Sequence, residues 1–343
     1  LNLAKHLSDN NYEIQIVTDR RGSKYLDSQE NLKISKLPSS PIIYKNLFTV
    51  FFSAIYVFFS ILYSIVYLIF RRPKIIIGMG GYASFPICIA AIILRIKFII
   101  YENNLIIGKA NKYLMPFANM MIVSNKSLEG VPINQSKKII EVGNIIKKEI
   151  IDFSKKNERI DKEKLNILVL GGSQAAKIFA ESLPKIFLKC SEQGFKLKIF
   201  QHCLPNQKNE LSLFYNNSNI EFETFNFSNN LNHYFSTADL AITRAGSSML
   251  AELTNANIPF ISVPLPSSAD KHQLKNAYYY KRKNYSFLIE EKDLNDKLSS
   301  LIADIYKNNS ILNKIVQNQR QHSDKNVYNN IDKILKEIID EKN

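Results

Sequence analysis

Short hydrophobic runs alternate with longer amphipathic stretches along the whole chain. Several runs consist almost entirely of Ile, Val and Leu, which is typical of strands buried on both faces of a parallel sheet. Repeated alternation of such strands with helices predicts doubly wound α/β domains. We expect strands at Glu13–Thr18, Lys74–Gly78, Lys97–Tyr101, Met120–Val123, Asn166–Leu170, Lys196–Gln201, Ile220–Thr224, Leu240–Thr243, Phe260–Val263 and Ser286–Ile289.

A polar, lysine-rich stretch divides this pattern into two series. Residues 152–164 (DFSKKNERIDKEK) predict a linker between a first domain over residues 1–151 and a second over residues 165–324. The length of 343 residues also favours two domains. The last part of the chain, about residues 325–343, predicts an amphipathic helix with Ile331, Ile334, Leu335 and Ile338 on one face.

The first residues, LNLAKHL, predict the end of an amphipathic helix, and the strand Glu13–Thr18 follows. A βα unit normally begins with a strand and a loop before its helix. We therefore expect that a first strand and loop would lie upstream of Leu1. The alternative is a domain that begins with a helix.

The segment Asn46–Phe70 is the most hydrophobic of the chain: it has no charge over 25 residues, and Arg71 and Arg72 follow it. Its length and polarity suit a transmembrane helix. The alternative is a helix that packs on the first domain and dips into the membrane surface. A span would place Glu13–Thr18 and Lys74–Gly78, both predicted for one sheet, on opposite sides of the bilayer. The many Phe and Tyr residues suit an interface, so we favour the second interpretation.

Composition excludes several classes of protein. Hydrophobic residues make up 45% and charged residues 22%, which is ordinary for a globular protein and unlike a disordered chain or a collagen-like fibre. The net charge of +14 favours a negatively charged partner, namely a nucleic acid, an anionic membrane surface or a phosphorylated substrate. Cys88, Cys190 and Cys203 lie far apart, which argues against a disulfide framework or a zinc site and favours a reducing compartment.

Two glycine-rich turns follow predicted strands. Gly171–Gln174 (GGSQ) precedes a predicted helix, where free N–H groups and the helix dipole can hold phosphate oxygens. Gly78–Tyr82 (GMGGY) could face a ligand at the edge of the other sheet. Each could instead be a plain βα turn. Neither matches GxxxxGK[ST] or a well-formed GxGxxG, which disfavours a P-loop nucleotidase and a nicotinamide dehydrogenase.

Polar residues also gather where other strands end. Thr243–Glu252 (TRAGSSMLAE) leads from a strand into a helix, and the carboxylate of Glu252 could accept two ribose hydroxyls or could be an ordinary solvated or capping glutamate. Asp270–Asn276 follows the strand Phe260–Val263, and Tyr101–Asn104 ends a strand of the first domain. Lys147 lies just before the linker, a natural place for a cation that faces a diphosphate.

Six motifs occur in one order along the chain: GMGGY, YENN, VGN-x-x-K (Val142–Lys147), GGSQ, R-x-G with Glu252 eight residues after Arg244, and D-x-x-Q-x-x-N. Each is weak alone, but the set resembles the MurG family of glycosyltransferases over essentially the whole chain. The resemblance implies a GT-B fold, with two Rossmann-like domains facing a cleft. It implies that the second domain holds UDP-N-acetylglucosamine. It also implies that the first domain meets a lipid acceptor at the membrane, and that the last helix packs back on the first domain.

The resemblance also implies roles for residues that hold the nucleotide. Ser173, with Gly172 and Gln174, would bind the diphosphate. Lys147 would contact the nucleotide or its phosphates, and Glu252 would hold the ribose hydroxyls.

Further positions would bind the base and the sugar. Backbone groups of Phe227 and Ser228 would meet the uracil, while Gln273 and Asn276 would bind sugar hydroxyls. The remaining substrate-binding residues belong to one turn and the helix that follows it: Arg244, Gly246, Ser247, Ser248 and Met249.

Asn104 would lie near the transferred sugar and the acceptor, and Asn104 and Glu102 are the candidate catalytic residues. The family carries its proposed base, a histidine, on a GGTGGH loop, which would lie upstream of Leu1 and is not in this chain. The chain also has Tyr101 where the family usually has His, Asn103 for Gln and Ala175 for Gly. Lys147 replaces Arg, which keeps the charge but loses the bidentate fork.

The activity implied is an inverting, metal-independent transfer of N-acetylglucosamine to the muramyl 4-hydroxyl of lipid I (undecaprenyl-pyrophosphoryl-N-acetylmuramyl-pentapeptide), giving lipid II for peptidoglycan synthesis. We expect no cofactor, no metal and no nucleic-acid partner. We also expect a peripheral location at the anionic cytoplasmic face of the bacterial inner membrane. Alternatives are a transferase for another lipid acceptor such as diacylglycerol, a UDP-N-acetylglucosamine epimerase, an inactive UDP-sugar-binding protein and an integral membrane protein. The oligomeric state and the acceptor's peptide stay open.

Overall fold

The computed structural model of the chain describes residues 1–23, 26, 32–39, 47–153, 164–171, 175–218, 220–226 and 231–340. These residues divide into two compact units. The first comprises Leu1–Ile145 together with Lys325–Asn343, and the second comprises Ile146–Asp324. The division falls six residues before the expected end of the first domain at residue 151, because the short helix α6 (Lys148–Ile151) packs against a helix of the second unit.

The strands of the first unit form two separate parallel sheets. β1 (Gln15–Thr18) pairs with β2 (Lys33–Lys36). β3 (Ile76–Gly78), β4 (Phe98–Glu102), β5 (Met120–Val123) and β6 (Ile139–Glu141) pair in chain order. The expectation of one sheet containing both β1 and β3 is therefore wrong for the described residues. The two sheets still belong to one unit, because α4 contacts β1 as well as β3.

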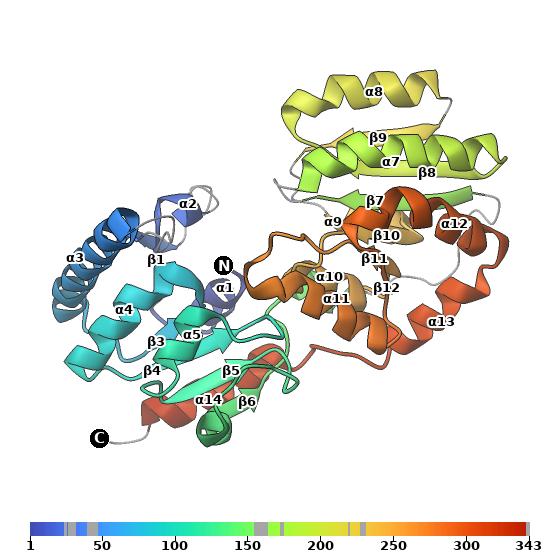
Figure 1. Ribbon diagram of the computed structural model, residues 1–343. Coiled ribbons are helices and arrows are strands. Elements are labelled where there is room, and N and C mark those ends of the chain that lie inside the picture. Colours follow the sequence, from blue (N-terminus) through green and yellow to red (C-terminus); the bar gives the residue numbers. More distant parts are fainter. Residues whose placement is uncertain are drawn as a thin grey trace. The chain divides into compact units, whose positions relative to one another are not determined.

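Helices surround these sheets (Figure 1). The central strand β4 has every residue buried, and Cys88, Ala90 and Ala91 of α4 pack into the same core as Ile100 and Met121. The small alanines let α4 approach the strands closely. The helices of this unit are α1 (Asn2–Asp9), α2 (Arg20–Ser23), α3 (Leu47–Arg71), α4 (Gly81–Leu94), α5 (Lys109–Leu114) and α14 (Val327–Asp340), with a 3-10 turn at Ile133–Lys138.

Helix α3 has two unlike faces. Ser60, Ser64 and Leu68, four residues apart, are buried where α3 packs along α4. The two serine hydroxyls donate to carbonyls one turn earlier in the helix, so no polar group is left unpaired there. The opposite face carries exposed Phe, Tyr and Ile side chains. The stretch Phe48–Arg71 is long and apolar enough to cross a membrane, and 17% of its most hydrophobic window is buried.

Helix α14 belongs to the first unit although it comes last in the chain. Its buried residues include Ile331, Ile334, Leu335 and Ile338, the face that the sequence pattern identified. His6 Nε2 of α1 donates to Asp332 Oδ2 of α14 at 2.9 Å, and the His6 ring centre lies 4.5 Å from that of Tyr328.

The second unit contains one parallel sheet. Its order is β12-β11-β10-β7-β8-β9, and after the edge strand β9 the chain crosses back past β8 and β7 to form β10 on the other side of β7. β7 carries the run KLNILVL, buried on both faces as expected for a central parallel strand. The strands are β7 (Lys164–Leu170), β8 (Lys196–His202), β9 (Glu221–Phe225), β10 (Leu240–Thr243), β11 (Phe260–Ser262) and β12 (Phe287–Leu288).

Helices pack on this sheet and share its core. Phe179, Leu183 and Phe187 of α7 pack with residues of α12 and with the strands. Figure 1 shows α7 and α8 running alongside β7, β8 and β9. Besides α6, the helices are α7 (Ala175–Glu192), α8 (Lys208–Asn217), α9 (Leu231–Thr237), α10 (Ser247–Asn255), α11 (His272–Arg282), α12 (Leu294–Lys307) and α13 (Ser310–Gln319).

Each of the ten expected strands overlaps an observed one, whereas β2 and β6 were not expected. Both lie at the end of a sheet and are short. β2 reads KISK and β6 reads IIE, with no residue fully buried in either, so neither produces the hydrophobic run that marks a central strand.

Candidate functional site

The carboxyl end of β10 leads directly into α10 through Arg244, Ala245 and Gly246. Ligands of doubly wound domains bind outside the carboxyl ends of parallel strands, and this is such a position. Gly246 immediately precedes α10, and Ser247, Ser248 and Met249 form the first turn. Ser248 is exposed, and Ser247 and Met249 are half-buried. The expected binding residues of this turn thus lie at the surface of the strand edge.

Arg244 is held by the protein itself. It is 9% exposed, and its Nη1 donates to the carbonyls of Val263 and Pro264, at 3.2 and 3.4 Å. Its Nη2 forms an ion pair with Glu291, and its guanidinium lies 5.2 Å from the ring centre of Phe179. These contacts tie the ends of β10 and β11 together, so the environment favours a structural role for Arg244 over the expected contact with substrate.

Glu252 lies in the middle of α10 and is 8% exposed. Burial raises the pKa of its carboxyl to about 7, while the positive charge of Lys147 acts in the opposite direction. Lys147 immediately precedes α6, which packs against α10. A buried carboxylate and a half-buried ammonium are therefore brought together from positions about a hundred residues apart in the chain. The sequence had predicted both for one nucleotide.

The turn between β11 and α11 is strained. Asp270 and Lys271 are consecutive non-glycine residues with φ of 50° and 54°, a conformation that costs free energy and is concentrated at functional sites. Gln273 Oε1 accepts a hydrogen bond from the Leu265 N–H at 2.9 Å. Nδ2 of the buried Asn276 donates to the Ala245 carbonyl at 3.2 Å. Both side chains thus brace the loops at this strand edge.

Some expected residues lie outside the described part of the chain. They are Gly172, Ser173, Gln174, Phe227 and Ser228. Gly171 is described and buried, directly after β7. β7 lies between β10 and β8 in the sheet, so the GGSQ motif starts at the same edge as Arg244 and α10.

In the first unit, Glu102 ends β4 and is 5% exposed. Its Oε1 accepts hydrogen bonds from the N–H and the Nδ2 of Asn104, both at 3.1 Å. Its Oε2 accepts from the Gly108 N–H and from Asn111 Nδ2, both at 2.9 Å. A carboxylate that accepts four hydrogen bonds shapes the loop after β4. This environment favours positioning of Asn104 over action as a base.

Asn111 was not singled out by sequence reasoning. It is 1% exposed, and its Nδ2 also donates to the Tyr101 carbonyl at 3.0 Å. Asparagine in a short polar helix has no distinctive spacing, so the sequence carried no signal for this role.

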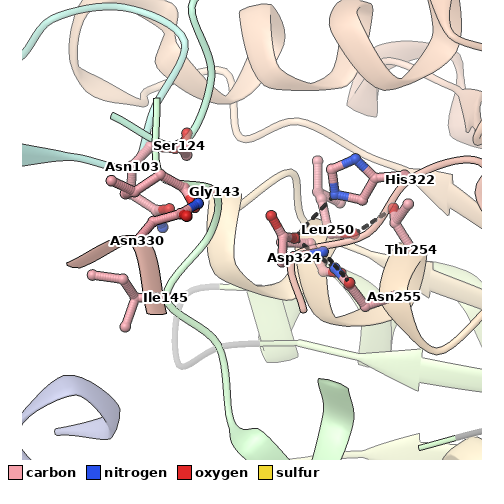
Figure 2. A network of polar contacts seen from close by, with 12 residues as sticks. Asn103, Ser124, Gly143, Ile145, Leu250, Thr254, Asn255, His322, Asp324 and Asn330 are labelled. Atoms are coloured by element: carbon pink, nitrogen blue, oxygen red, sulfur yellow. Dashed lines mark hydrogen bonds and ion pairs between the residues drawn. The ribbon is translucent and has the colours of Figure 1, made fainter. Parts of the chain in front are cut away.

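Tyr101 connects β4 to the last loop of the first unit. Its hydroxyl lies 2.9 Å from Asn103 Oδ1 and 3.3 Å from the Gly143 carbonyl, and it accepts a hydrogen bond from the Ile145 N–H at 3.1 Å. Ser124 donates to the Asn103 carbonyl, and Figure 2 labels Asn103, Ser124, Gly143 and Ile145. The VGN segment is thus held against the YENN segment, as two motifs of one site require.

Figure 2 also shows a network in the second unit around Asp324, the last residue before the chain returns to the first unit. Asp324 Oδ2 accepts from Asn255 Nδ2 at 2.7 Å and lies 3.0 Å from His322 Nε2. The Asp324 N–H donates to Asn255 Oδ1 at 3.0 Å. Since Asn255 ends α10, this network fixes the far end of the helix that carries Glu252.

The GMGGY turn favours glycine at three positions, Gly78, Gly80 and Gly81. A Cβ at Gly78 would lie 2.9 Å from the Sγ of Cys88, so only glycine lets α4 approach β3 this closely. Gly80 has φ of 79° and precedes α4. Packing thus explains Gly78, whereas Gly81 has φ of 74° and is exposed, with no atom within 4 Å of a Cβ built on it.

Charged groups and hydrogen-bond donors that could bind a nucleotide are present at these strand edges. A cluster of metal ligands is absent among the residues described. In that part of the chain no three His, Cys, Asp or Glu side chains gather as metal ligands would. The chemistry available at the strand edges is that of Lys147, Glu252, hydroxyls and backbone amides.

Comparison with known proteins agrees with this arrangement. Residues 1–123 match the glycosyltransferase family 28 N-terminal domain, and residues 166–333 match the glycosyltransferase family 28 C-terminal domain. The fold is the two-domain GT-B α/β fold. The chain belongs to glycosyltransferase family 28.

Relatives match over nearly their full length. A protein of Pelagibacter ubique is 33% identical over 342 residues, covering 98% of this chain and 93% of the relative. One of Rickettsia bellii is 30% identical, covering 97% and 94%. Both are named UDP-N-acetylglucosamine–N-acetylmuramyl-(pentapeptide) pyrophosphoryl-undecaprenol N-acetylglucosamine transferase.

Solved structures share the fold. The crystal structure of Acinetobacter baumannii MurG superimposes with a TM-score of 0.77 at 20% identity, covering 98% of this chain and 94% of that one. A structure of S. aureus MnaA with UDP gives 0.63 at 13% identity, covering 96% and 98%. The resemblance drawn from six motifs is confirmed.

Proposed function

We propose that this chain transfers N-acetylglucosamine from UDP-N-acetylglucosamine to the muramyl 4-hydroxyl of lipid I, with inversion at the anomeric carbon, to give lipid II. The near full-length similarity to relatives named for this reaction carries the proposal. The positive charge of Lys147 acts on Glu252 of α10, the helix that follows β10. This supports the proposal, because a nucleotide sugar can bind a carboxylate through its ribose hydroxyls and a cation through its diphosphate.

In the donor site, Glu252 accepts the ribose hydroxyls and Lys147 faces the diphosphate. The GGSQ segment follows β7 and supplies amides and the Ser173 hydroxyl to the phosphates. As the glycosidic bond breaks, negative charge grows on the leaving UDP, and these groups stabilise it. Gln273 and Asn276 hold the turn against which the sugar lies, and Phe227 and Ser228 meet the uracil.

In the acceptor site, Asn104 contacts the reacting sugar. Glu102 accepts hydrogen bonds from Asn104 and is itself held by Asn111. The acceptor hydroxyl loses its proton as the new bond forms, and a general base for such a step contributes about 10²–10⁴-fold. Because both Glu102 oxygens already accept two hydrogen bonds each, we place the base at a group other than Glu102.

The lipid acceptor requires a location at the membrane. We propose that the exposed face of α3 inserts into the cytoplasmic surface of the inner membrane. Phe48, Phe52 and Phe59 on this face are 77%, 65% and 61% exposed, while the other face packs on α4. A helix with aromatic residues on one side and a protein domain on the other suits insertion parallel to the surface. The excess of basic residues favours an anionic leaflet.

The test is transfer from labelled UDP-N-acetylglucosamine to a short-chain lipid I analogue, beside diacylglycerol as a second acceptor. We expect transfer to the lipid I analogue alone, and equal rates with and without EDTA. We expect Glu252→Ala to raise the KM for the donor at least tenfold. The exposed Glu210 on α8 provides the matched control, since Glu210→Ala removes a carboxylate far along the sheet from α10.

Transfer to diacylglycerol with none to lipid I would overturn the acceptor assignment. Binding of UDP-N-acetylglucosamine without transfer to either acceptor would indicate a binding protein instead. Loss of activity in EDTA, restored by a divalent cation, would overturn the expected independence of metal.

A further inference from the structure

A second group of charged residues lies in the first unit, at the carboxyl end of β1. Asp19 is the first residue after the strand and is 7% exposed. Its Oδ1 accepts hydrogen bonds from the N–H groups of Arg21 and Gly22, at 3.1 and 2.7 Å. Its Oδ2 accepts from the Tyr82 hydroxyl at 3.2 Å. The turn after β1 is thereby joined to the GMGGY turn after β3.

Arg21 is held in this cluster by two contacts. Its Nε lies 3.5 Å from Asp19 Oδ2, and its guanidinium carbon lies 4.8 Å from the ring centre of Tyr82. The side chain is nevertheless 64% exposed. Within the described part of the chain, no hydrogen bond or ion pair engages its two terminal nitrogens. The guanidinium is therefore positioned on one side and open on the other.

The surface beside Arg21 is open as well. Gly81, next to Tyr82 in the chain, is exposed, and a Cβ built on it would meet no atom within 4 Å. The strands β1 and β3 both end here, at the kind of edge where α/β domains bind ligands. Arg20 adds a second exposed positive charge, so the segment Asp19–Arg21 carries a net charge of about +1, which favours an anion.

The planar shape of the Arg21 guanidinium indicates that the anion is a phosphate or a pyrophosphate. The two terminal nitrogens of a guanidinium form a planar fork that fits two oxygens of one phosphate or of neighbouring phosphates. The acceptor in the proposed function carries a pyrophosphate between its sugar and its lipid. We propose that Arg21 binds the pyrophosphate of the lipid-linked acceptor, held ready for it by Asp19 and Tyr82. This rests on the proposed function for the identity of the acceptor.

Preorganisation explains why Asp19 and Tyr82 matter. An arginine that is free in solution loses side-chain entropy when it binds, whereas one already stacked on a ring and paired through Nε loses less. Lysine at this position would keep the charge and lose both the fork and the Nε contact. Arg21 is therefore a positioning and affinity residue for the acceptor, with no part in donor binding.

The experiment is a calorimetric titration with a short-chain, water-soluble lipid I analogue in the absence of membrane, so that affinity is measured without turnover. The wild type is compared with Arg21→Ala, Arg21→Lys and the matched control Arg20→Ala. A second analogue carries a monophosphate in place of the pyrophosphate. Thermal unfolding of each variant checks that the first unit is folded.

We expect Arg21→Ala to weaken binding of the pyrophosphate analogue about 10- to 100-fold, as for loss of a bidentate charge-assisted pair. Arg21→Lys should recover part of this loss. Arg20→Ala should change the affinity for the pyrophosphate analogue less than about twofold, as for an exposed charge. The Arg21→Ala variant should bind the two analogues with nearly equal affinity, and its affinity for UDP should match that of the wild type.

Four results would overturn the assignment. One is unchanged affinity of Arg21→Ala for the pyrophosphate analogue, and another is equal weakening for both analogues. The third is weaker binding of Arg21→Ala to anionic vesicles without acceptor while acceptor affinity stays unchanged, which would assign Arg21 to lipid headgroups. A wild type that does not bind the pyrophosphate analogue also overturns it. A wild type that binds the analogue but does not transfer sugar defeats the proposed function alone.

Discussion

At the scale of single residues, the proposed donor site contains a carboxyl group whose pKa lies close to neutral pH. Burial in α10 raises the pKa of Glu252 to about 7, and the charge of Lys147 limits that rise. Ribose hydroxyls donate hydrogen bonds, so they favour the ionised form. If Glu252 holds the ribose as proposed, we expect donor binding to be coupled to its ionisation.

We expect the affinity for UDP to increase as pH rises from 6 to 8, because the ionised fraction of Glu252 increases over this range. Glu252→Gln should weaken UDP binding and remove this pH dependence. The measurement is calorimetric titration of UDP at several pH values, with Glu210→Gln as the control. A wild-type affinity that does not change across this range would contradict the prediction.

The raised pKa of Glu252 also makes the free energy of unfolding depend on pH. The folded-state pKa of Glu252 lies above its ordinary value of 4.5, so the unfolded chain releases the proton first. The free energy of unfolding should therefore fall as pH rises from about 4.5 to about 7, by roughly 3 kcal/mol from this group. Glu252→Gln should flatten that fall in denaturant unfolding curves. A steeper fall in the variant would contradict it.

The carboxylate of Glu102, in contrast, accepts four hydrogen bonds from the loop that follows β4 and from α5. In Glu102→Gln, one side-chain oxygen becomes an NH2 group that faces the Gly108 N–H and Asn111, or the two donors of Asn104. We expect a loss of roughly 2–4 kcal/mol in the free energy of unfolding, since donors are left without acceptors. We also expect a lower kcat.

A pH–rate profile distinguishes the two roles of Glu102. A positioning role leaves the shape of the profile unchanged in Glu102→Gln, while a base role removes its acidic limb. Glu141, exposed at the end of β6, supplies the control Glu141→Gln. Disappearance of the acidic limb would return Glu102 to the role of base.

At the scale of elements, α3 is the part of the fold whose exposed surface is least suited to water. Twelve of its side chains count among the exposed large hydrophobic residues, from Phe48 to Phe70. Contiguous apolar patches of this kind mark membrane or protein contacts. The face with Ser60 and Ser64 packs on α4, so only the opposite face of α3 can contact a bilayer.

We expect Phe52→Glu with Phe59→Glu to weaken binding to anionic vesicles by at least a hundredfold, because each Phe withdrawn from the bilayer loses about 1.5–3 kcal/mol. Transfer to a water-soluble acceptor should be unchanged. Phe117→Glu is the control, since Phe117 is 60% exposed but lies outside α3. Cosedimentation with vesicles measures the effect.

Alkaline carbonate extraction tests the same helix in membranes. If α3 lies at the membrane surface, we expect alkaline carbonate to release the protein into the supernatant. Retention in the pellet would indicate a span and would contradict the packing of α3 along α4.

At the scale of the whole molecule, the chain leaves the first unit after Ile145 and returns to it at Lys325. The returning helix α14 buries Ile331 completely, pairs Asp332 with His6 and receives a hydrogen bond from Lys97 at the Ile338 carbonyl. The first unit is therefore complete only when α14 has docked on residues 1–145.

We expect Ile331→Ala to destabilise the first unit by about 2–5 kcal/mol, the usual cost of a cavity in a well-packed core. Hydrogen exchange should increase in peptides from residues 1–145 and stay unchanged in peptides from residues 164–324. Lys336→Ala, on the exposed face of the same helix, is the control. Equal increases in both units would contradict independent stability of the two.

Much of the candidate site could be predicted because turn chemistry is local. Short motifs of neighbouring residues marked three of its turns. These are the turn with Gly78 and Gly80, the strand-to-helix turn at Arg244 and the polar segment after β11. The role of Arg244 could not be predicted, because its partners Val263, Pro264 and Glu291 come from other turns. Arg21 was missed for the same reason: its ring partner is 61 residues away.

The sequence by itself determined the alternation of strands and helices, the two-domain organisation, the family and the positions of its motifs. These depend on hydrophobic periodicity and on short-range backbone preferences, which are written in neighbouring residues. Only the tertiary structure decided which side chains are engaged by the scaffold and which stay open to a ligand. It separated β1 from the sheet of β3 and joined α6 to α10. It also placed Asn111 beside Glu102 and left the side chain of Arg21 64% exposed. These outcomes depend on contacts between residues distant in the chain, and no local pattern encodes them.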